Sequence, residues 1–129
     1  MLQFTVGQST YESLQYAQAL ASVRRIAAAL LARGLSAERP VMILSGNSID
    51  HAIVMFGALY AGVAMCPVSP PYSLVSKDYG KLRHIVSLLT PGLIFAEDVT
   101  PFAPAILATV PANVEIVATR GSVEGRSVT

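Results

Sequence analysis

The segment Ser45–Ser48 is the first place where this chain of 129 residues could bind a ligand. It follows a short apolar run, Pro40–Ser45, and precedes an apolar stretch of helical length. Free backbone N–H groups and the helix dipole at such a position can hold an anion. A simpler explanation is that Gly46 turns the chain and Asn47 caps the helix, with Asp50 three residues on. Because capping accounts for these residue types, it is favoured over an anion site.

The second candidate is the proline-rich segment Ser69-Pro70-Pro71-Tyr72-Ser73. Two consecutive prolines can continue neither a helix nor a central strand, so the segment is predicted to be a rigid loop with the amphipathic Tyr72 at its tip. Loops on a rigid scaffold carry binding residues, although turn geometry explains such residues more often. Both interpretations stay open.

The other groups that could do chemistry are isolated from one another. His51 and His84 lack partners at metal-ligand spacing and are interpreted as surface or boundary residues. Cys66, the single cysteine, excludes an internal disulfide and a cysteine-based zinc site and fits a buried thiol. The acidic residues form no pair that the sequence places together: Asp50, Asp78, Glu97 and Asp98. Glycine-rich phosphate loops and the HExxH and GxSxG motifs are absent. We therefore expect no catalytic residue and no metal site.

The elements that must position these groups alternate along the chain. Apolar spacing predicts a helix that ends at Arg33 and buries the following residues: Tyr16, Leu20, Val23, Ala27 and Leu30. Its start stays open, because Ser9-Thr10-Tyr11-Glu12 fits a capping box that would begin the helix near Thr10. Strands are predicted at 40–45, 63–68, 93–96 and 114–118. Helices are predicted at 47–61, from a Ser76 cap to Pro91, and at 101–110.

This alternation predicts an α/β fold, a parallel sheet with βαβ crossovers. The length allows one domain over residues 1–129, in which the polar tail 121–129 is predicted to be frayed. Apolar residues make up 53% and charged residues 13% of the chain, which excludes disorder. The net charge of +1 argues against nucleic acid as a partner.

The composition also bears on membranes and on partners. The uncharged run Ala52–Val68 contains Gly57 and Gly62 and closes at Pro67, so we interpret it as a helix followed by a strand and expect no membrane span. Met1–Gln15 lacks the pattern of a secretory signal, and we expect a cytoplasmic protein. Because the chain is so apolar, we expect a hydrophobic surface too large to be buried within a single copy. Such a surface favours self-association.

Three short motifs resemble those of a known superfamily. The run Leu59-Tyr60-Ala61-Gly62-Val63-Ala64-Met65-Cys66-Pro67-Val68-Ser69 resembles the second core motif of the adenylate-forming (AMP-binding) superfamily, which includes the acyl- and aryl-CoA ligases. Leu14-Gln15-Tyr16-Ala17-Gln18-Ala19-Leu20 is similar to its first core motif, although Gln15 stands where the family usually has Thr or Ser. Ser45-Gly46-Asn47-Ser48 matches the turn after the first strand. The resemblance covers about residues 14–120.

A narrower likeness points to one branch of the superfamily. Ser69–Asp78 together with Lys81–Ile85 is similar to the feruloyl-CoA synthetases, which activate hydroxycinnamic acids. The resemblance implies an enzyme in which a carboxylate attacks the α-phosphate of ATP to give acyl-AMP, after which CoA displaces AMP. ATP, Mg²⁺, CoA and a hydroxycinnamate-like acid are the implied ligands of that whole enzyme. Ser69, Pro70 and Tyr72 match a loop that contacts CoA in related ligases.

The family's later motifs have no counterpart in these residues. Its phosphate loop ending in Pro-Lys-Gly, its adenine- and Mg²⁺-binding motifs and its C-terminal lysine are missing, so no catalytic residue is carried over. The resemblance thus implies an N-terminal fragment that is inactive alone and holds none of these cofactors. A self-standing, non-enzymatic α/β binding module is the alternative, and a membrane-attached fragment is a third possibility.

Overall fold

A four-stranded parallel sheet forms the centre of the chain, which the computed structural model describes over residues 2–6 and 10–129. The strands lie in the order β4-β3-β5-β6, with bounds β3 Val41–Ile43, β4 Met65–Pro67, β5 Leu93–Asp98 and β6 Glu115–Arg120. Met42 pairs with Cys66 of β4 on one side and with Ile94 of β5 on the other. All three strand pairings are parallel, because each connection contains a helix. The predicted fold class is confirmed.

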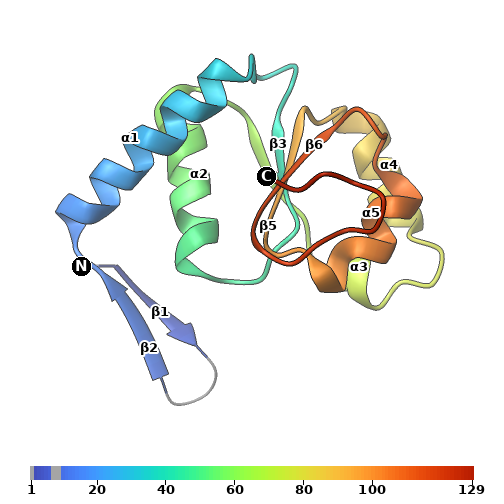
Figure 1. Cartoon of the computed structure of the whole chain (residues 1–129), viewed down its shortest axis with the longest axis horizontal. Helices are drawn as coiled ribbons and strands as arrows, with labels where there is room; N and C mark the ends of the chain where they lie inside the picture. The colour runs from blue at the N-terminus through green and yellow to red at the C-terminus, as the bar shows by residue number, and fades with distance from the viewer. Residues whose placement is uncertain (1, 7–9) are drawn as a thin grey trace.

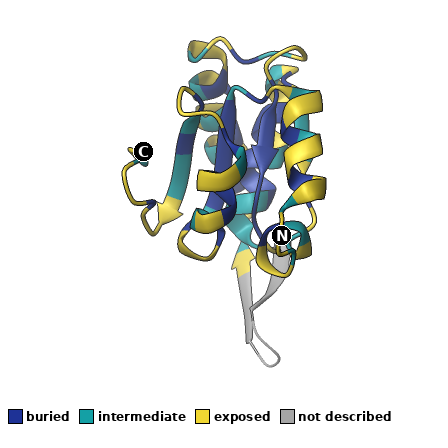
Figure 2. Cartoon of the chain, turned by 90° about the vertical axis from the view of Figure 1, so that its right-hand side faces the viewer, coloured by how far each residue is buried: buried dark blue, intermediate teal, exposed yellow. Residues whose placement is uncertain are grey.

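Helices cover both faces of this sheet (Figure 1). One layer contains α1 (Tyr16–Ala32) and α2 (Ile49–Ala61), and the other contains α3 (Pro71–Leu74), α4 (Gly80–Leu89), the 3-10 turn η1 (Thr100–Phe102) and α5 (Ala103–Thr109). Val41 and Ile43 pack toward the first layer, whereas Met42 and Leu44 pack toward the second. Figure 2 shows the resulting buried strands between helices whose outer faces are exposed. The alternation of side chains along β3 therefore divides the core in two.

The buried face of α1 begins later than predicted. Val23, Ala27 and Leu30 are buried, but Tyr16 is 67% exposed and Leu20 44% exposed. Near this end of the helix the buried residue is Ala19, which lies in one cluster with Val23 and with Ile53 of α2. The prediction for Tyr16 and Leu20 was wrong because the first turns of α1 pack on α2 and not on the sheet.

The close approach of α1 and α2 occurs at Gly57. A Cβ atom at this position would lie 2.5 Å from Cγ2 and 2.9 Å from Cβ of Ile26. Such a separation is shorter than any stable contact between carbon atoms. Gly57 therefore allows α2 to seat against α1, and any side chain here would push the two helices apart.

The residues before α1 form an antiparallel hairpin in place of an earlier helix turn. β1 (Leu2–Val6) pairs with β2 (Thr10–Leu14), and the register places Phe4 opposite Glu12. Helix α1 begins at Tyr16 after Gln15, whose side chain makes no capping hydrogen bond. The capping box predicted for Thr10 is wrong because Thr10 and Glu12 belong to a strand, and Ser9 lies outside the described residues.

One other helix start differs from the prediction. Ser76 does not cap α4: its Oγ accepts the N–H of Tyr79 at 3.0 Å within a turn, and the helix begins at Gly80 after Tyr79 with φ 55°.

The uncharged run is divided as predicted, since α2 ends at Ala61 and Gly62 adopts φ 72°. No helix of the described residues is long and apolar enough to cross a membrane.

The tail 121–129 is folded onto the sheet, which corrects the predicted fraying. Val123 is buried, and Val128 forms a parallel bridge to Ile116 of β6. The guanidinium of Arg126 donates to the carbonyl oxygens of Val110, Pro111 and Val114 at 3.3, 3.1 and 2.8 Å. A polar composition predicted disorder, but these contacts use the polar groups to anchor the segment.

Candidate functional site

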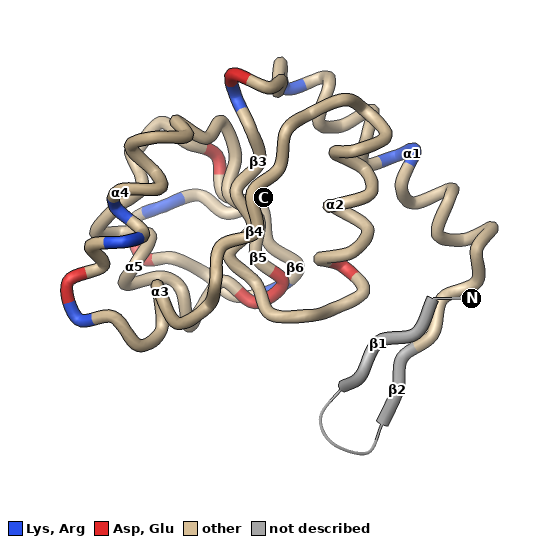
Figure 3. Tube along the Cα trace, turned by 180° about the vertical axis from the view of Figure 1, so that it is seen from behind, with Lys and Arg blue, Asp and Glu red and all other residues tan. Residues whose placement is uncertain are grey.

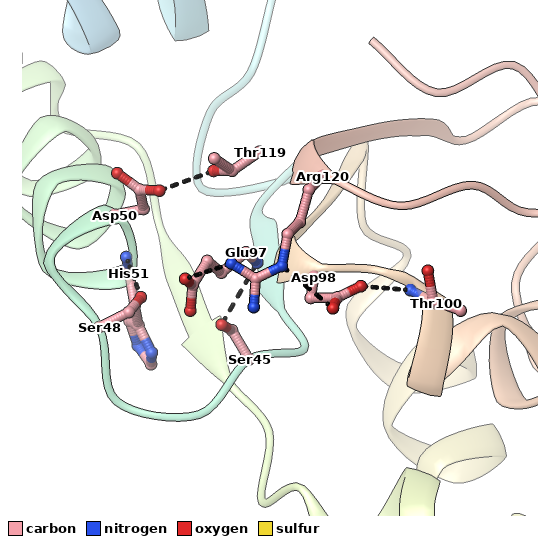
Figure 4. A network of polar contacts seen from close by, with 9 residues as sticks. All are labelled: Ser45, Ser48, Asp50, His51, Glu97, Asp98, Thr100, Thr119 and Arg120. Atoms are coloured by element: carbon pink, nitrogen blue, oxygen red, sulfur yellow. Dashed lines mark hydrogen bonds and ion pairs between the residues drawn. The ribbon is translucent and has the colours of Figure 1, made fainter. Parts of the chain in front are cut away.

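The strand order places a crevice between the carboxyl ends of β3 and β5. Helix α2 follows β3 over one face of the sheet and α5 follows β5 over the other, and open parallel sheets bind ligands where the connections diverge in this way. Ser45 leaves β3 at this point and is buried. Its Oγ accepts the backbone N–H of Glu97 at 3.3 Å (Figure 4). This hydrogen bond joins the two strand ends across the crevice.

Arg120, at the end of β6, holds both carboxylates of β5. Its Nη1 lies 3.2 Å from Oε1 of Glu97, and its Nε lies 3.1 Å from Oδ2 of Asp98 (Figure 4). The N–H of Thr100 donates to Asp98 at 3.0 Å. This N–H and then Arg120 lower the pKa of Asp98 below its ordinary value, and Asp98 in turn raises the pKa of Arg120. The ion pair with Asp98 thus favours the charged forms of both Asp98 and Arg120.

The start of α2 is capped by Ser48, whereas the sequence predicted Asn47 as the cap. Ser48 Oγ accepts the N–H of His51 at 3.0 Å, and Nδ1 of His51 lies 3.0 Å from the carbonyl oxygen of Gly46. Ser48 has the extended backbone typical of an N-cap, which places its hydroxyl over the first turn. The observed N-cap lies one residue after the predicted one. Asn and Ser side chains can both accept the capping hydrogen bond, and in this turn it is the Ser48 hydroxyl that lies over the first turn of α2.

The charges at this edge of the sheet oppose anion binding. Arg120 contacts the carboxylates of Glu97 and Asp98, and Asp50 at the start of α2 accepts a hydrogen bond from Thr119 Oγ1 at 2.7 Å. Figure 3 shows acidic residues where β5 and β6 end and where α2 begins. A phosphate group would meet net negative charge here. The geometry therefore supports the capping interpretation of Ser45–Ser48. Sequence reasoning missed Thr119 and Arg120 because it ended the last strand at 118.

The proline-rich segment is a short helix and not a loop, which corrects the prediction. Pro71 occupies the first turn of α3, where its missing N–H is not needed and its fixed φ fits the helix. Ser69 is exposed, and its carbonyl oxygen accepts the N–H of Tyr72 at 3.0 Å. Pro70 already has helical backbone angles. The two prolines therefore start a helical turn, and Tyr72 is half-buried within it and not at a loop tip.

A shallow pocket of about 370 Å³ lies between α3 and α4. Tyr72, Gly80, Lys81, His84 and Ile85 line it. Lys81 Nζ lies 5.0 Å from the centre of the Tyr72 ring, within the range of a cation–π contact. The ammonium, the imidazole and the phenol could each donate a hydrogen bond to an anion. The structure thus brings Tyr72 together with Lys81 and His84, which the sequence had assigned to an ordinary helix surface.

Two other side chains near this region have defined environments. Ser73 is 5% exposed, and its Oγ has no hydrogen-bond partner among the described residues. Cys66 lies half-buried in β4, and burial raises the pKa of its thiol. A raised pKa favours the unreactive thiol over the thiolate nucleophile. The described residues contain no cluster of three His, Cys, Asp or Glu side chains able to hold a metal.

A four-stranded parallel sheet with helices on both faces defines the chain as an α/β domain. The chain belongs to the AMP-binding enzyme family, whose sequence profile matches residues 3–127. None of the curated protein sequences compared with the chain matches it. The suspected superfamily is therefore confirmed, and the match extends further in both directions than residues 14–120.

Solved structures show the same fold. The fatty acyl-adenylate ligase from L. pneumophila, in complex with acyl adenylate and pyrophosphate, is 26% identical with a TM-score of 0.63 over 88% of this chain and 19% of that chain. A benzoate CoA ligase from Burkholderia xenovorans LB400 is 18% identical with a TM-score of 0.69 over 84% and 21%. A red-emitting luciferase from Phrixothrix hirtus is 22% identical with a TM-score of 0.68 over 91% and 28%.

These matches also define how much of a relative this chain represents. The chain spans between 16% and 28% of the length of the similar structures. Its sheet corresponds to the N-terminal domain of adenylate-forming enzymes. The substrate branch is not decided by these structures, because they include a fatty acyl and a benzoate ligase at similar scores.

Proposed function

We propose that this chain is the N-terminal part of an ATP-dependent aromatic acid–CoA ligase of the feruloyl-CoA synthetase type. The match to the AMP-binding enzyme family over residues 3–127 carries this proposal. The likeness of Ser69–Asp78 and Lys81–Ile85 to feruloyl-CoA synthetases supports the choice of a hydroxycinnamate-like acid. The proposed whole enzyme is cytoplasmic and forms acyl-AMP and then acyl-CoA.

The chain is proposed to be inactive without the rest of such an enzyme. The described residues contain no cluster of three metal-ligating side chains, and residues 1–129 include neither the family's phosphate loop ending in Pro-Lys-Gly nor its C-terminal lysine. ATP–pyrophosphate exchange by the purified chain with ferulate should therefore stay at background. Measurable adenylate formation by the 129-residue chain would contradict the fragment proposal.

The coding sequence after Thr129 separates the fragment from its alternative. An open reading frame that continues into a Ser/Thr/Gly-rich loop ending in Pro-Lys-Gly supports the ligase. A stop codon after Thr129 favours the self-standing binding module. For a longer product, ferulate should give a higher kcat/KM than benzoate or a long-chain fatty acid. Preference for a fatty acid would contradict the feruloyl branch and leave the family unchanged.

The region around α3 fits a contact with CoA. Ser69 is exposed and Pro70 is half-buried. The Lys81 ammonium lies over the ring of Tyr72. Hydroxyl and ammonium groups in such an open pocket can donate to the phosphates of a nucleotide. In the longer enzyme, Tyr72→Ala should raise the KM for CoA and leave ATP–pyrophosphate exchange unchanged. An equal loss in both half-reactions would assign Tyr72 to folding and not to CoA.

Self-association of the chain is proposed on its exposed apolar face. Three large side chains of α2 point outward: Phe56 at 38%, Leu59 at 59% and Tyr60 at 59% exposure. They share one side of an uncharged helix surface and would be covered by a second copy at little electrostatic cost. Light scattering at tens of micromolar should detect a dimer, and Leu59→Lys should abolish it. A monomer that binds no hydrophobic dye would contradict this surface and favour the self-standing module.

A further inference from the structure

The amino-terminal edge of the sheet carries a groove of about 600 Å³, opposite the edge that holds Glu97, Asp98 and Arg120. The C-terminal end of α4 forms one wall and the connection from α5 to β6 forms another. Its floor is apolar and is made by the following side chains: Val86, Pro91, Pro111 and Val114. This volume falls within the usual range for small-molecule sites.

Two arginines line this groove. Among residues 13–129 the ion pairs within 4.0 Å involve Arg33 and Arg120, and neither Arg39 nor Arg83 takes part in one. Arg83 still lies near enough to Asp78 to contribute to the lowered pKa of that carboxyl. Arg83 donates through Nη1 to the carbonyl oxygen of Ala108 at 2.8 Å, which fixes the side chain and leaves other guanidinium N–H groups for a ligand. Two guanidinium groups on one groove therefore favour an anionic ligand.

The walls of the groove are held by hydrogen bonds. The N–H of Gly92 donates to the carbonyl oxygen of Pro40 at 3.0 Å, and a Cβ at Gly92 would lie 3.0 Å from Nε and Nη2 of Arg39. The Arg39 guanidinium thus rests against the Gly92 backbone. On the other wall, Arg126 donates to the carbonyl oxygen of Pro111. A groove with fixed walls loses little entropy when a ligand binds.

We propose that this groove binds a small organic anion with a flat apolar body, such as a phosphate monoester of an aromatic alcohol. Arg39 and Arg83 would receive the charged group, while Ser87, Thr90 and Asn113 supply polar contacts at the rim. The apolar floor would cover the body of the ligand. This site is independent of the ligase proposal, because it lies away from α3 and uses none of the residues assigned to CoA.

Phenyl phosphate is the probe, and amide chemical shifts of the 129-residue chain are the readout. Saturable shifts should appear at Thr90, Gly92 and Asn113 with a millimolar dissociation constant. Inorganic phosphate should bind more weakly for lack of apolar contact, and phenol should give no saturable shift. Arg39→Gln should weaken phenyl phosphate binding about tenfold, the usual loss of one charge-assisted contact.

The control is Arg24→Gln, which removes the same charge from an exposed position on α1. Equal weakening by Arg24→Gln would show a general charge effect and overturn the proposal. Inorganic phosphate binding as tightly as phenyl phosphate would also overturn it, because the floor would then contribute nothing. The proposal would also be overturned if phenyl phosphate gave no saturable amide shift at Gly92 in the folded wild-type chain. Within residues 13–129 the Arg39 guanidinium forms no hydrogen bond or ion pair, so its variant tests the site, whereas Arg83→Gln removes the hydrogen bond to Ala108 and could loosen α5.

Discussion

On one face of the sheet, α1 and α2 pack against each other through apolar side chains and the close approach at Gly57. On the other face, Arg83 of α4 donates through Nη1 to the carbonyl oxygen of Ala108 in α5. Arg126 donates to the carbonyl oxygen of Val114 and anchors the tail. The first arrangement tolerates little change in volume, whereas the second permits irregular segments such as α3. The residues proposed to bind small ligands lie on the second face and at the edges of the sheet, whereas the first face carries the exposed side of α2 proposed for self-association.

The largest effect that would test this contrast is expected at Gly57. Gly57→Ala introduces a Cβ 2.5 Å from Ile26, and overpacking should exceed the gain in helix propensity, with a net loss of about 2 kcal/mol in the free energy of unfolding. Urea denaturation followed by circular dichroism measures it. Gly46→Ala, which meets no atom within 4 Å, is the matched control and should change stability little. Equal losses of stability in Gly57→Ala and Gly46→Ala would contradict close packing between α1 and α2.

The second effect concerns the anchor of the tail. Arg126→Ala removes hydrogen bonds to three carbonyl oxygens and should cost about 1.5 kcal/mol. Amide hydrogen exchange should also rise at Val128 and Thr129. The exposed Arg24→Ala on α1 is the control and should have little effect. If Arg126→Ala leaves exchange in the tail unchanged, hydrogen bonding does not hold the second face as described.

A smaller effect of opposite sign is expected at Ser73. Its buried Oγ has no partner among the described residues, so Ser73→Ala should stabilise the chain by about 1 kcal/mol by removing an unsatisfied polar group. Ser87→Ala, at an exposed helical position of α4, controls for the higher helix propensity of alanine. A loss of stability in Ser73→Ala would show that the hydroxyl has a partner in solution.

The smallest effect is expected from the charged groups at the carboxyl edge. The Thr100 N–H and Arg120 lower the pKa of Asp98 in the folded chain, so its contribution is present above the unfolded pKa of about 4 and is lost as the pH falls below that value. Asp98→Asn should therefore reduce the acid-induced loss of stability between about pH 4 and pH 2. An unchanged pH profile would mean that these exposed ion pairs contribute nothing.

Much of the fold could be predicted because hydrophobic periodicity is a local signal. The run Val41–Leu44 predicts a buried strand, and the uncharged residues up to Ala61 predict a helix. That helix was expected to be covered on nearly all sides, which was wrong because Leu59 and Tyr60 are each 59% exposed. The helix-length segments between strands then require parallel pairing. Cys66 was likewise predicted correctly as a residue of an apolar strand, although the structure leaves it half-buried at the sheet edge.

Tertiary structure alone decided where polar side chains meet. Arg120 joins Glu97 and Asp98 although 23 and 22 residues separate them, and Arg126 reaches back to Val110. The sequence determined the strands, the main helices and the family motifs, because each depends on neighbouring residues. The docking of the tail and the position of Arg39 and Arg83 along one groove depend on contacts between distant segments. Such contacts form only when the whole sheet has folded, so no local pattern contains them.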